Sequence, residues 1–346
     1  MDLTKDGHKI FSQSAKDFES LALEVFRFQY HNNPVYHDYV DALHVNVAGP
    51  GSIARIPFLP IRFFKSHPLQ ATAFDPEMVF ESSGTTGSTG SRHLVKDIGL
   101  YKTSFTNGFE LAYGPVKDWC VIGLLPSYIE RGNSSLVYMV NELIQQSGHA
   151  HSRFYLNEFD KLVATLANLE RAKQKTILIG VTFALLDFAG KYSLRLEHTT
   201  IMETGGMKGR RKEMIREEVH AILKKSFDVP VIHSEYGMTE LLSQAYSKGN
   251  GIFHCPPWMK MLIRDDEDPL SVVSSQTSVG SRQSSVDSHQ SSLIARGGIN
   301  IIDLANIYSC SFIATDDAGK LYSDGNFEVL GRIDNSDIRG CSLMTI

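Results

Sequence analysis

A run of nine consecutive glycine, serine and threonine residues occupies Ser82–Gly90. Its three glycines let the backbone turn tightly and approach a ligand, and its six hydroxyls can surround phosphate oxygens together with backbone N–H groups. The run is not a GxxxxGK(S/T) loop, because no lysine directly follows its last glycine. A flexible linker would have a similar composition, although the apolar pairs Val79-Phe80 and Leu94-Val95 flank the run. The residues alone leave phosphate binding and a linker as the two interpretations.

A second candidate is the string Tyr236-Gly237-Met238-Thr239-Glu240, which we expect to follow a strand at Val229–His233. An aromatic ring can stack on a base, and a threonine hydroxyl can bind a phosphate oxygen. Glu240 offers hard oxygen ligands of the kind that Mg²⁺ prefers. A surface loop can have the same five residues, so the string by itself is weak support for a site.

A third candidate is Gly331-Arg332-Ile333-Asp334, preceded by Asp316 in a Thr-Asp-Asp-Ala-Gly segment that we expect to form a turn. An acidic side chain can accept hydrogen bonds from both hydroxyls of a ribose, and an arginine can bind phosphate. These residues would suit a nucleotide.

The elements that must position these residues alternate between helix and strand. Apolar residues recur at helical spacing after Phe18, and Asn32-Asn33-Pro34 breaks that pattern. Strand-like and helix-like segments then alternate, which predicts an α/β fold with parallel strands. The expected strands are Cys120–Leu125, Thr176–Val181, Ile201–Glu203 and Val229–His233, and the expected helices are Asn133–Gly148, Phe159–Leu169 and residues 210–226.

The segment after residue 251 is expected to be rich in short strands, with turns at Gly297-Gly298, Asp317–Gly319 and Asp324–Asn326. Within it, Ser271–Ser292 has ten serines in 22 residues and no aromatic residue. Such a segment buries too little apolar surface to order itself, so we expect a mobile loop, with a phosphorylated regulatory tract as the alternative.

The composition excludes several classes of protein. The 346 residues, of which 42% are hydrophobic and 21% charged, are those of an ordinary globular chain of one large or two smaller domains. The net charge of −5 is opposite to that of a typical duplex DNA binder, and we expect no nucleic-acid partner. The four cysteines form no disulfide framework or zinc motif. With no signal peptide and no apolar run long enough to span a bilayer, the expected location is cytoplasmic.

Taken in order along the chain, the three candidates resemble motifs of the adenylate-forming superfamily, which contains acyl- and aryl-CoA ligases, luciferases and nonribosomal adenylation domains. Ser83–Gly90 is similar to its phosphate loop, Tyr236–Glu240 to its Y-G-x-T-E motif, and Gly331–Asp334 to its G-R-x-D hinge. Three further segments are similar to the branch that contains the acyl-protein synthetase of the bacterial bioluminescence fatty-acid reductase complex: Ile56–Lys65, Arg131–Leu136 and Arg339–Leu343.

The resemblance implies the large N-terminal domain of the adenylate-forming fold, with parallel sheets, helices and a β-rich subdomain. It implies ATP and Mg²⁺ as cofactors and a carboxylic acid, with a fatty acid favoured, as substrate. Catalysis would depend on Thr239, Glu240 (also the metal ligand) and Arg332. The nucleotide-binding residues it implies are Ser83, Gly84, Thr85, Thr86, Gly87, Ser88, Gly205, Gly206, Tyr236, Gly237 and Asp316.

Two features depart from the superfamily. Its phosphate loop usually continues to a lysine, whereas this chain has Arg92 and His93 in that region. Its members usually continue after the hinge into a small domain that carries a catalytic lysine, and this sequence ends at Ile346. We therefore expect an adenylating domain at 1–330 and a hinge with a short tail at 331–346, without that second domain. Lys65 is a candidate to replace the lysine, although a surface role is equally compatible with its context.

Cys341, beside Arg339 in the expected tail, matches the cysteine near the C-terminus that accepts the acyl group in the bioluminescence branch. A nearby cation favours the reactive thiolate, while a small residue that packs the last strand is the alternative. The expected function is therefore formation of acyl-AMP and transfer of the acyl group to a thiol, with an acyl-accepting or reductase protein as a possible partner. An acid–coenzyme A ligase and a noncatalytic nucleotide- or acyl-binding subunit are the alternatives.

Overall fold

The computed structural model describes residues 7–12, 17–47, 51–82, 90–125, 133–205, 214–265, 268–273 and 291–333. The chain divides into two compact units. Unit 1 consists of Met1–Met78, His93–Asp97 and His254–Ile346, and unit 2 consists of Val79–Arg92 and Ile98–Phe253. The short strands β2 (Met78–Glu81), β3 (Arg92–Val95) and β10 (Ile252–His254) lie where the chain passes from one unit to the other.

Unit 2 contains a mostly parallel sheet with the strand order β9-β8-β7-β6-β4-β5. All neighbours from β5 to β8 pair in parallel, and β9 pairs with β8 antiparallel. The two central strands are buried along their whole length, as expected for a parallel sheet with both faces covered. Their bounds, and those of the other strands, are β4 (Cys120–Leu124), β5 (Arg153–Phe154), β6 (Thr176–Gly180), β7 (Thr199–Glu203), β8 (His233–Tyr236) and β9 (Ala245–Ser247).

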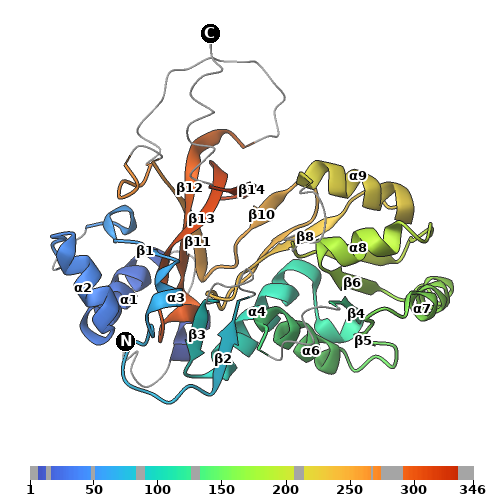
Figure 1. The fold of residues 1–346 in the computed structure, drawn as a ribbon, viewed down its shortest axis with the longest axis horizontal. Helices are drawn as coiled ribbons and strands as arrows, with labels where there is room; N and C mark the ends of the chain where they lie inside the picture. Colours follow the sequence, from blue (N-terminus) through green and yellow to red (C-terminus); the bar gives the residue numbers. More distant parts are fainter. Residues whose placement is uncertain are drawn as a thin grey trace, which may run out of the picture. The chain divides into compact units, whose positions relative to one another are not determined.

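Helices cover both faces of this sheet. Figure 1 shows α8 and α9 on one face and α4 and α6 on the other. The helix α6 follows the predicted pattern closely, because Ser134 caps its first turn and Gly148 ends it in a left-handed conformation. The helices of unit 2 are α4 (Ile98–Tyr113), the 3₁₀ turn η4 (Val116–Asp118), α6 (Ser135–Ser147), α7 (Phe159–Arg171), α8 (Thr182–Ala189) and α9 (Arg216–Phe227).

Two predicted boundaries in unit 2 are wrong. The strand expected at Val229–His233 begins only at His233 and runs to Tyr236. Pro230 has no backbone N–H to donate to a sheet, and Asp228 ends α9 in a left-handed conformation, so the chain needs several residues before it can pair. Helix α9 starts at Arg216 rather than near 210, because Ile215 is extended; residues 210–213 lie outside the described residues.

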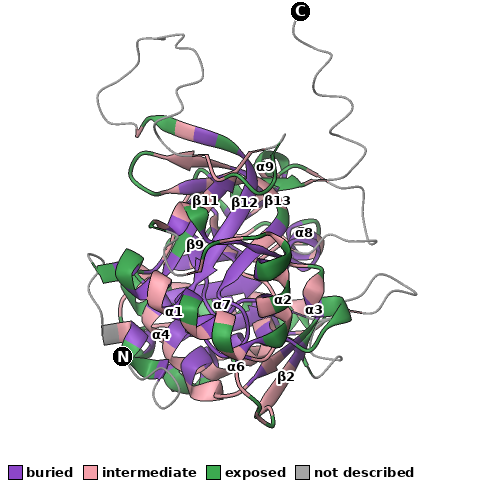
Figure 2. Cartoon of the chain, turned by 90° about the vertical axis from the view of Figure 1, so that its left-hand side faces the viewer, coloured by how far each residue is buried: buried purple, intermediate pink, exposed green. Residues whose placement is uncertain are grey.

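Unit 1 contains an antiparallel sheet with the order β11-β12-β13-β14, and the two-residue strand β1 (Leu59–Pro60) pairs with β13 in parallel. This is the β-rich portion that the sequence predicted after residue 251. Figure 2 shows buried residues along much of β12, seven of which in succession form its C-terminal part. The strands are β11 (Met259–Arg264), β12 (Leu293–Asp303), β13 (Phe312–Tyr322) and β14 (Phe327–Arg332).

Two of the predicted turns in unit 1 are wrong, and Asp316 does not lie in a turn. Gly297-Gly298 belongs to β12, and Asp317–Gly319 belongs to β13 with Asp316. These glycines serve close packing, since a Cβ on Gly319 would lie 2.6 Å from the carbonyl oxygen of Glu328. Both strands change register beside the glycines. The turn predicted at Asp324–Asn326 is present between β13 and β14.

An N-terminal helical hairpin packs on this sheet within unit 1. The predicted break at Asn32-Asn33-Pro34 separates α1 (Phe18–Asn32) from α2 (Pro34–Ala42), and the Asn33 side chain caps α2. Phe26 of α1 meets Phe312 of β13 edge to face, with ring centroids 6.1 Å apart. The remaining short helices of unit 1 are η1 (Gly7–Ser12), η3 (Ile53–Arg55), α3 (Phe63–Ser66) and η5 (Leu304–Asn306).

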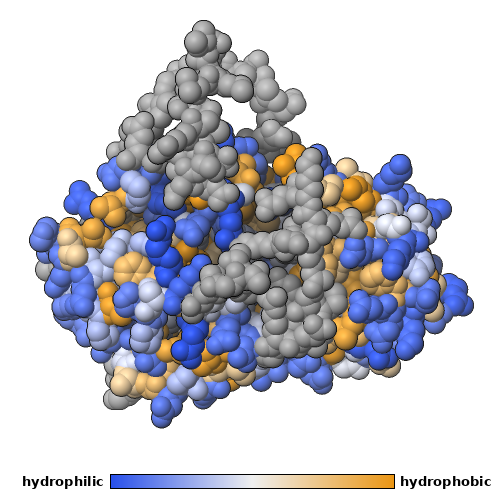
Figure 3. All heavy atoms as spheres, in the orientation of Figure 1, coloured by the Kyte–Doolittle hydropathy of each residue, from blue (hydrophilic) through white to orange (hydrophobic). Residues whose placement is uncertain are grey.

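On the face drawn in Figure 3, hydrophobic residues are scattered among hydrophilic ones. No helix in the described ranges has the length and apolar character that crossing a bilayer requires. Most of the serine-rich segment, residues 274–290, lies outside the described residues, and so does the predicted tail from residue 334 onward. The mobile loop and the domain boundary at 330 therefore stay predictions.

Candidate active site

The carboxyl ends of the parallel strands in unit 2 define the edge where a ligand is expected. From β4 the chain continues through α6 to β5 on one side, whereas from β6 it continues through α8 to β7 on the other. In open α/β sheets, ligands bind outside the carboxyl ends of the strands at such a reversal of strand order. The backbone joins these ends: Thr204 donates to the carbonyl of Gly180 (3.1 Å), and Thr182 donates to the carbonyl of Gly205 (2.8 Å).

The base of the predicted phosphate loop is closed and anchored to this edge. Ser82 donates its backbone N–H to the carbonyl of Ser91 (3.0 Å), and the Ser82 hydroxyl accepts the N–H of Ser91 (2.8 Å). Only glycine fits at Gly90, where a Cβ would lie 2.5 Å from the carbonyl oxygen of Ser82. Glu81 donates to the carbonyl of Asn133 (2.9 Å), which directly precedes the cap of α6. The loop therefore starts beside the positive end of a helix dipole, where phosphate is favoured.

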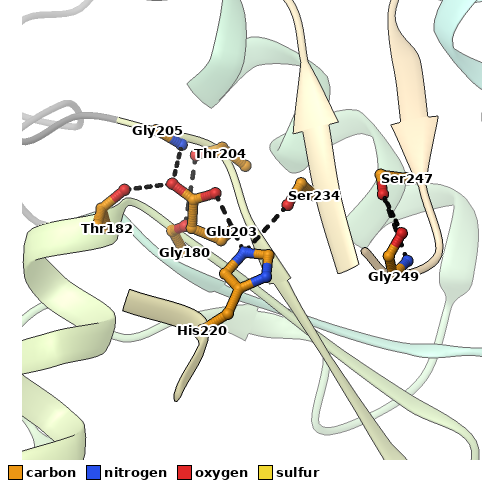
Figure 4. Close-up of polar contacts among 9 residues, drawn as sticks. All are labelled: Gly180, Thr182, Glu203, Thr204, Gly205, His220, Ser234, Ser247 and Gly249. Atoms are coloured by element: carbon orange, nitrogen blue, oxygen red, sulfur yellow. Dashed lines mark hydrogen bonds and ion pairs between the residues drawn. The ribbon is translucent and has the colours of Figure 1, made fainter. Parts of the chain in front are cut away.

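The glycine turn after β7 is held by a buried carboxylate that the sequence analysis did not single out. Glu203, 8% exposed, accepts hydrogen bonds at Oε1 from the backbone N–H of Gly205 (2.8 Å) and from the hydroxyl of Thr182 (Figure 4). Gly205 has a φ of 76°, which is the left-handed region that glycine adopts easily. The signal in the sequence was a charged residue at the end of an otherwise buried strand, since buried charges require partners.

His220 of α9 faces the other oxygen of the same carboxylate. Its Nε2 lies 4.0 Å from Oε2 of Glu203 and 3.4 Å from the hydroxyl of Ser234 in β8 (Figure 4). Burial raises the pKa of Glu203. The hydrogen bonds from His220 and Thr182, the positive charge of Arg216 and the N–H of Gly205 together lower it by more, so the pKa lies below its ordinary value. Glu203 is therefore ionised at neutral pH.

The Tyr236–Glu240 segment starts inside the sheet, because Tyr236 is the last residue of β8. Its ring is buried and packs against Phe253 with ring centroids 6.0 Å apart, so stacking on a base would need its exposed margin. Gly237 and Met238 leave the sheet edge, and Thr239 and Glu240 form a turn in which Leu241 donates to the carbonyl of Met238. Thr239 is half-buried and Glu240 is buried.

Glu235, which precedes Tyr236 in β8, is a second carboxyl that sequence reasoning missed. Burial raises its pKa to about 8, and the negative charge of Glu203 acts in the same direction. Across the strand pair it lies opposite Tyr246 of β9. Neighbouring strand ends thus carry one ionised and one largely neutral carboxyl at neutral pH.

His233, at the start of β8, packs against Tyr113 of α4. Burial, followed by the positive charge of Lys248, lowers its pKa to about 4, so it is neutral at physiological pH. Its Nδ1 lies 3.2 Å from the hydroxyl of Tyr113, and the two rings are 5.7 Å apart.

Asp316 and Arg332 belong to unit 1, where they lie on the paired strands β13 and β14. Asp317 is paired with Arg332 across β13 and β14, and Ile333 donates its N–H to the carbonyl of Asp316 (2.8 Å). The side chains of Asp316 and Arg332 are exposed.

Arg264 of β11 braces the segment that carries Asp316. Its guanidinium donates to the carbonyl oxygens of Ile299 (2.7 Å) and Thr315 (2.6 Å). The hydroxyl of Thr315 in turn accepts the backbone N–H of Asp317 (3.1 Å). A lone arginine in an apolar strand was the only sequence signal for this contact.

Several predicted site residues lie outside the described residues, and the structure tests none of their roles. They are Ser83, Gly84, Thr85, Thr86, Gly87 and Ser88 of the phosphate loop, Gly206 of the glycine turn, and Cys341.

The structure shows the surroundings of the residues at which this chain differs from the superfamily pattern, and of Lys65, the candidate replacement for the missing lysine. His93 is buried, lies 2.9 Å from the side-chain oxygen of Asn306 and contacts Phe64 edge to face, all within unit 1. Arg92 is exposed and lies 3.6 Å from Glu81. Lys65 is exposed on α3.

No group of three or more His, Cys, Asp or Glu side chains suited to a metal ion occurs in the part of the chain that the structure describes. Mg²⁺ usually binds to one or two carboxylates together with substrate phosphates and water. Glu240, as a single carboxylate in a turn at the sheet edge, fits that mode.

Comparison with known proteins identifies the fold. ATP-bound MatB from Rhodopseudomonas palustris is 16% identical with a TM-score of 0.51, over 76% of this chain and 50% of that chain. A long-chain-fatty-acid-CoA ligase from Archaeoglobus fulgidus is 13% identical with a TM-score of 0.50, over 77% of this chain and 53% of that chain. The chain thus spans about half the length of these proteins. A search of curated proteins finds no match.

These likenesses define the class: the chain has the fold of the N-terminal domain of adenylate-forming enzymes, and the predicted α/β fold class is confirmed. The sequence also matches the family described as acyl-protein synthetase, LuxE, over residues 9–345. The chain belongs to this acyl-protein synthetase family, which confirms the predicted branch.

Proposed function

We propose that the protein uses ATP to activate a carboxylic acid as acyl-AMP and then transfers the acyl group to a thiol. The observation that carries the proposal is the arrangement in unit 2. Gly205 and the Tyr236–Glu240 segment follow the carboxyl ends of the neighbouring strands β7 and β8, and Glu81, just before the predicted phosphate loop, donates to the carbonyl of Asn133 at the start of α6 after β4. The family match supports the same reaction class.

In the first step, a carboxylate oxygen of the acid attacks the α-phosphorus of ATP. The bond between that phosphorus and the bridging oxygen breaks, and pyrophosphate leaves with the electron pair. The nucleophile is already an anion, so no general base is required. The barrier lies mainly in the approach of an anion to a polyanion, which positioned hydrogen-bond donors lower.

The residues would divide this work between them. Ser83, Thr85, Thr86 and Ser88 would donate to the β- and γ-phosphates, and Thr239 to the α-phosphate. The turn at Gly205 and Gly206 would pass along the nucleotide, with Tyr236 and Gly237 beside it. Asp316 would accept hydrogen bonds from the ribose hydroxyls, and Arg332 would supply positive charge.

Glu240 would hold Mg²⁺, which when bound neutralises part of the phosphate charge. Its position in the turn that follows the last residue of β8, within the segment similar to the Y-G-x-T-E motif, supports Glu240 as the ligand.

In the second step, a thiolate attacks the carbonyl carbon of acyl-AMP, the bond to the phosphate oxygen breaks, and AMP leaves. We propose Cys341 as this thiol, and a fatty acid as the substrate. The thioester would then pass to an acyl-accepting or reductase protein. The family description and the raised pKa values of the described cysteines support this choice over Cys120, Cys255 and Cys310.

The first step is tested by ATP–pyrophosphate exchange with straight-chain acids of increasing length. We expect exchange that depends on the acid and on Mg²⁺. The variant Glu240→Gln should lose about a hundredfold in rate or more, because a neutral amide is a poorer ligand and stabiliser of charge. The matched control Glu217→Gln removes an exposed carboxylate from α9 and should leave the rate unchanged.

Release of phosphate in place of pyrophosphate, or absence of exchange with every acid, would contradict the proposed function. An exchange rate in Glu240→Gln equal to that of the wild type would remove Glu240 from the mechanism while leaving the reaction class in place.

A further inference from the structure

We propose that Glu203 is a positioning residue, whose carboxylate holds the Gly205 turn in the shape that binds the nucleotide. The inference rests on the proposed function for the assignment of the turn to ATP. It assigns to Glu203 no contact with the substrate: the residue acts through the backbone of the turn.

The carboxylate joins three different elements at the edge of the sheet (Figure 4). Glu203 ends β7, and its Oε1 accepts hydrogen bonds from Gly205 in the turn and from Thr182 at the start of α8. Thr182 also donates its own N–H to the carbonyl of Gly205 (2.8 Å). The N–H and the carbonyl of Gly205 are therefore both fixed, one by the carboxylate and one by the residue that the carboxylate binds.

The same carboxylate is linked to the strand that leads into Tyr236–Glu240. Oε2 of Glu203 faces Nε2 of His220, which also lies within hydrogen-bonding reach of the Ser234 hydroxyl. Ser234 is paired with Glu203 in the register of β7 and β8 and stands two residues before Tyr236. The Glu203 carboxylate is thus linked, through His220 and in addition to the backbone pairing of β7 and β8, to both segments proposed to bind the nucleotide.

Stability alone is a poor explanation for this carboxylate. An ionised group that is only 8% exposed must be compensated by hydrogen bonds and charges, and apolar residues in its place are often equally stable or better. The hydrogen bonds that Glu203 accepts from Gly205 and Thr182 hold the backbone conformation at Gly205. That is the arrangement expected where backbone geometry matters for binding.

The protein contains a matched carboxylate at the opposite end of the same strand. Glu170 of α7 accepts the backbone N–H groups of Glu197 and His198 (both 2.9 Å at Oε2) and the hydroxyl of Thr199, the first residue of β7. It performs the same kind of bracing at the amino edge, away from the proposed nucleotide site. Glu170→Gln is therefore a control for the general cost of loosening β7.

The first measurement is the dissociation constant of ATP by calorimetry, together with the kcat and KM of pyrophosphate exchange. We expect Glu203→Gln to raise both the Kd and the KM for ATP about tenfold, the effect of weakening one charge-assisted hydrogen bond. The kcat at saturating ATP and the KM for the acid should stay within about twofold. Thr182→Val should act in the same direction, and Thr182→Ser, which keeps the hydroxyl, should restore wild-type values.

The second measurement is amide hydrogen exchange of the backbone N–H of Gly205, which needs no turnover. We expect Glu203→Gln to increase this exchange rate about tenfold or more and Glu170→Gln to leave it unchanged. If Glu203→Gln fails to fold, Thr182→Val tests the same brace with a side chain of nearly equal volume.

The results separate this inference from the proposed function. A wild type that exchanges no pyrophosphate with any acid refutes the proposed function, while the Kd for ATP and the Gly205 exchange rate still decide the role of Glu203. Unchanged exchange at Gly205 in both Glu203→Gln and Thr182→Val overturns the inference. So does an equal loss of ATP affinity in Glu170→Gln, or a rise in the KM for the acid alone.

Discussion

Two carboxyl groups at adjacent strand ends behave in opposite ways. Glu203 has partners that favour its charge, and its pKa lies below the ordinary value. Glu235 is desolvated beside that charge, and its pKa rises to about 8. At neutral pH the pair therefore carries one negative charge, because ionising both would place like charges close together between the buried Glu203 and the half-buried Glu235.

This difference predicts an unusual dependence of stability on pH. Glu235 takes up its proton more readily in the folded protein than at its ordinary pKa of 4.5. Its contribution to stability is therefore present below about pH 4.5 and is lost as the pH rises through about 8. Between these values the loss approaches about 1.4 kcal/mol per pH unit.

Glu235→Gln should remove that dependence, because an amide does not titrate. Urea unfolding at pH 6 and pH 8.5 measures it: the wild type should lose stability relative to the variant at the higher pH. Parallel changes in the two proteins would show that Glu235 titrates near its ordinary value.

At the scale of the elements, the sequence predicted most of unit 2 because its signals are local. The helix that ends at Gly148 and the apolar runs of β4 and β6 each depend on residues close in the chain. The glycines of β12 and β13 were misread as turns because their role depends on another strand. Gly319 faces a carbonyl of β14 that no local pattern reveals.

The same distinction explains the site. The strings Ser82–Gly90 and Tyr236–Glu240 are contiguous, so composition and resemblance could find them. Glu203, His220 and Thr182 are separated in the chain and meet only through the order of strands β6, β7 and β8. Their contact depends on the order of the strands in the sheet. The sequence predicted an α/β fold with parallel strands but not that order.

The serine-rich segment gives a prediction about an element. Its described ends are attached to unit 1, since Val273 donates to the carbonyl of Ile263 and Ser323 donates to that of Ser292. Replacing only residues 274–290 with a short Gly/Ser linker should leave the melting temperature within about 2 °C, because loop length costs little entropy and the segment has little to bury. A fall in melting temperature of the size caused by a core substitution would show that the segment packs on the protein.

For the molecule as a whole, the proposed acyl transfer needs a reactive thiol. Burial raises the pKa of Cys120 to about 11 and those of Cys255 and Cys310 to about 12, so all three are protonated at neutral pH. Thiols in this state are poor nucleophiles. The three therefore serve as internal controls for Cys341.

Incubation with ATP, Mg²⁺ and a substrate acid should add one acyl mass to the protein, and neutral hydroxylamine should remove it. Cys341→Ser should still exchange pyrophosphate but should not accumulate this label, because adenylation and transfer use different groups. Intact-mass and peptide mass spectrometry would locate the thioester. A label on one of the other cysteines, or consumption of coenzyme A without any protein label, would refute Cys341 as acceptor.

The interleaving of the two units also sets an order of events during synthesis. Gln29 of α1 donates to the carbonyl of Ile307 and accepts the N–H of Ser311, a residue 282 positions later in the chain. At about 5–20 residues per second, a ribosome needs roughly 15–55 s to cover that distance. All of unit 2 emerges in the interval. The apolar face of α1 therefore stays without its partner sheet while unit 2 is synthesised, and a chaperone that binds this nascent helix would cover that exposed apolar surface during the interval.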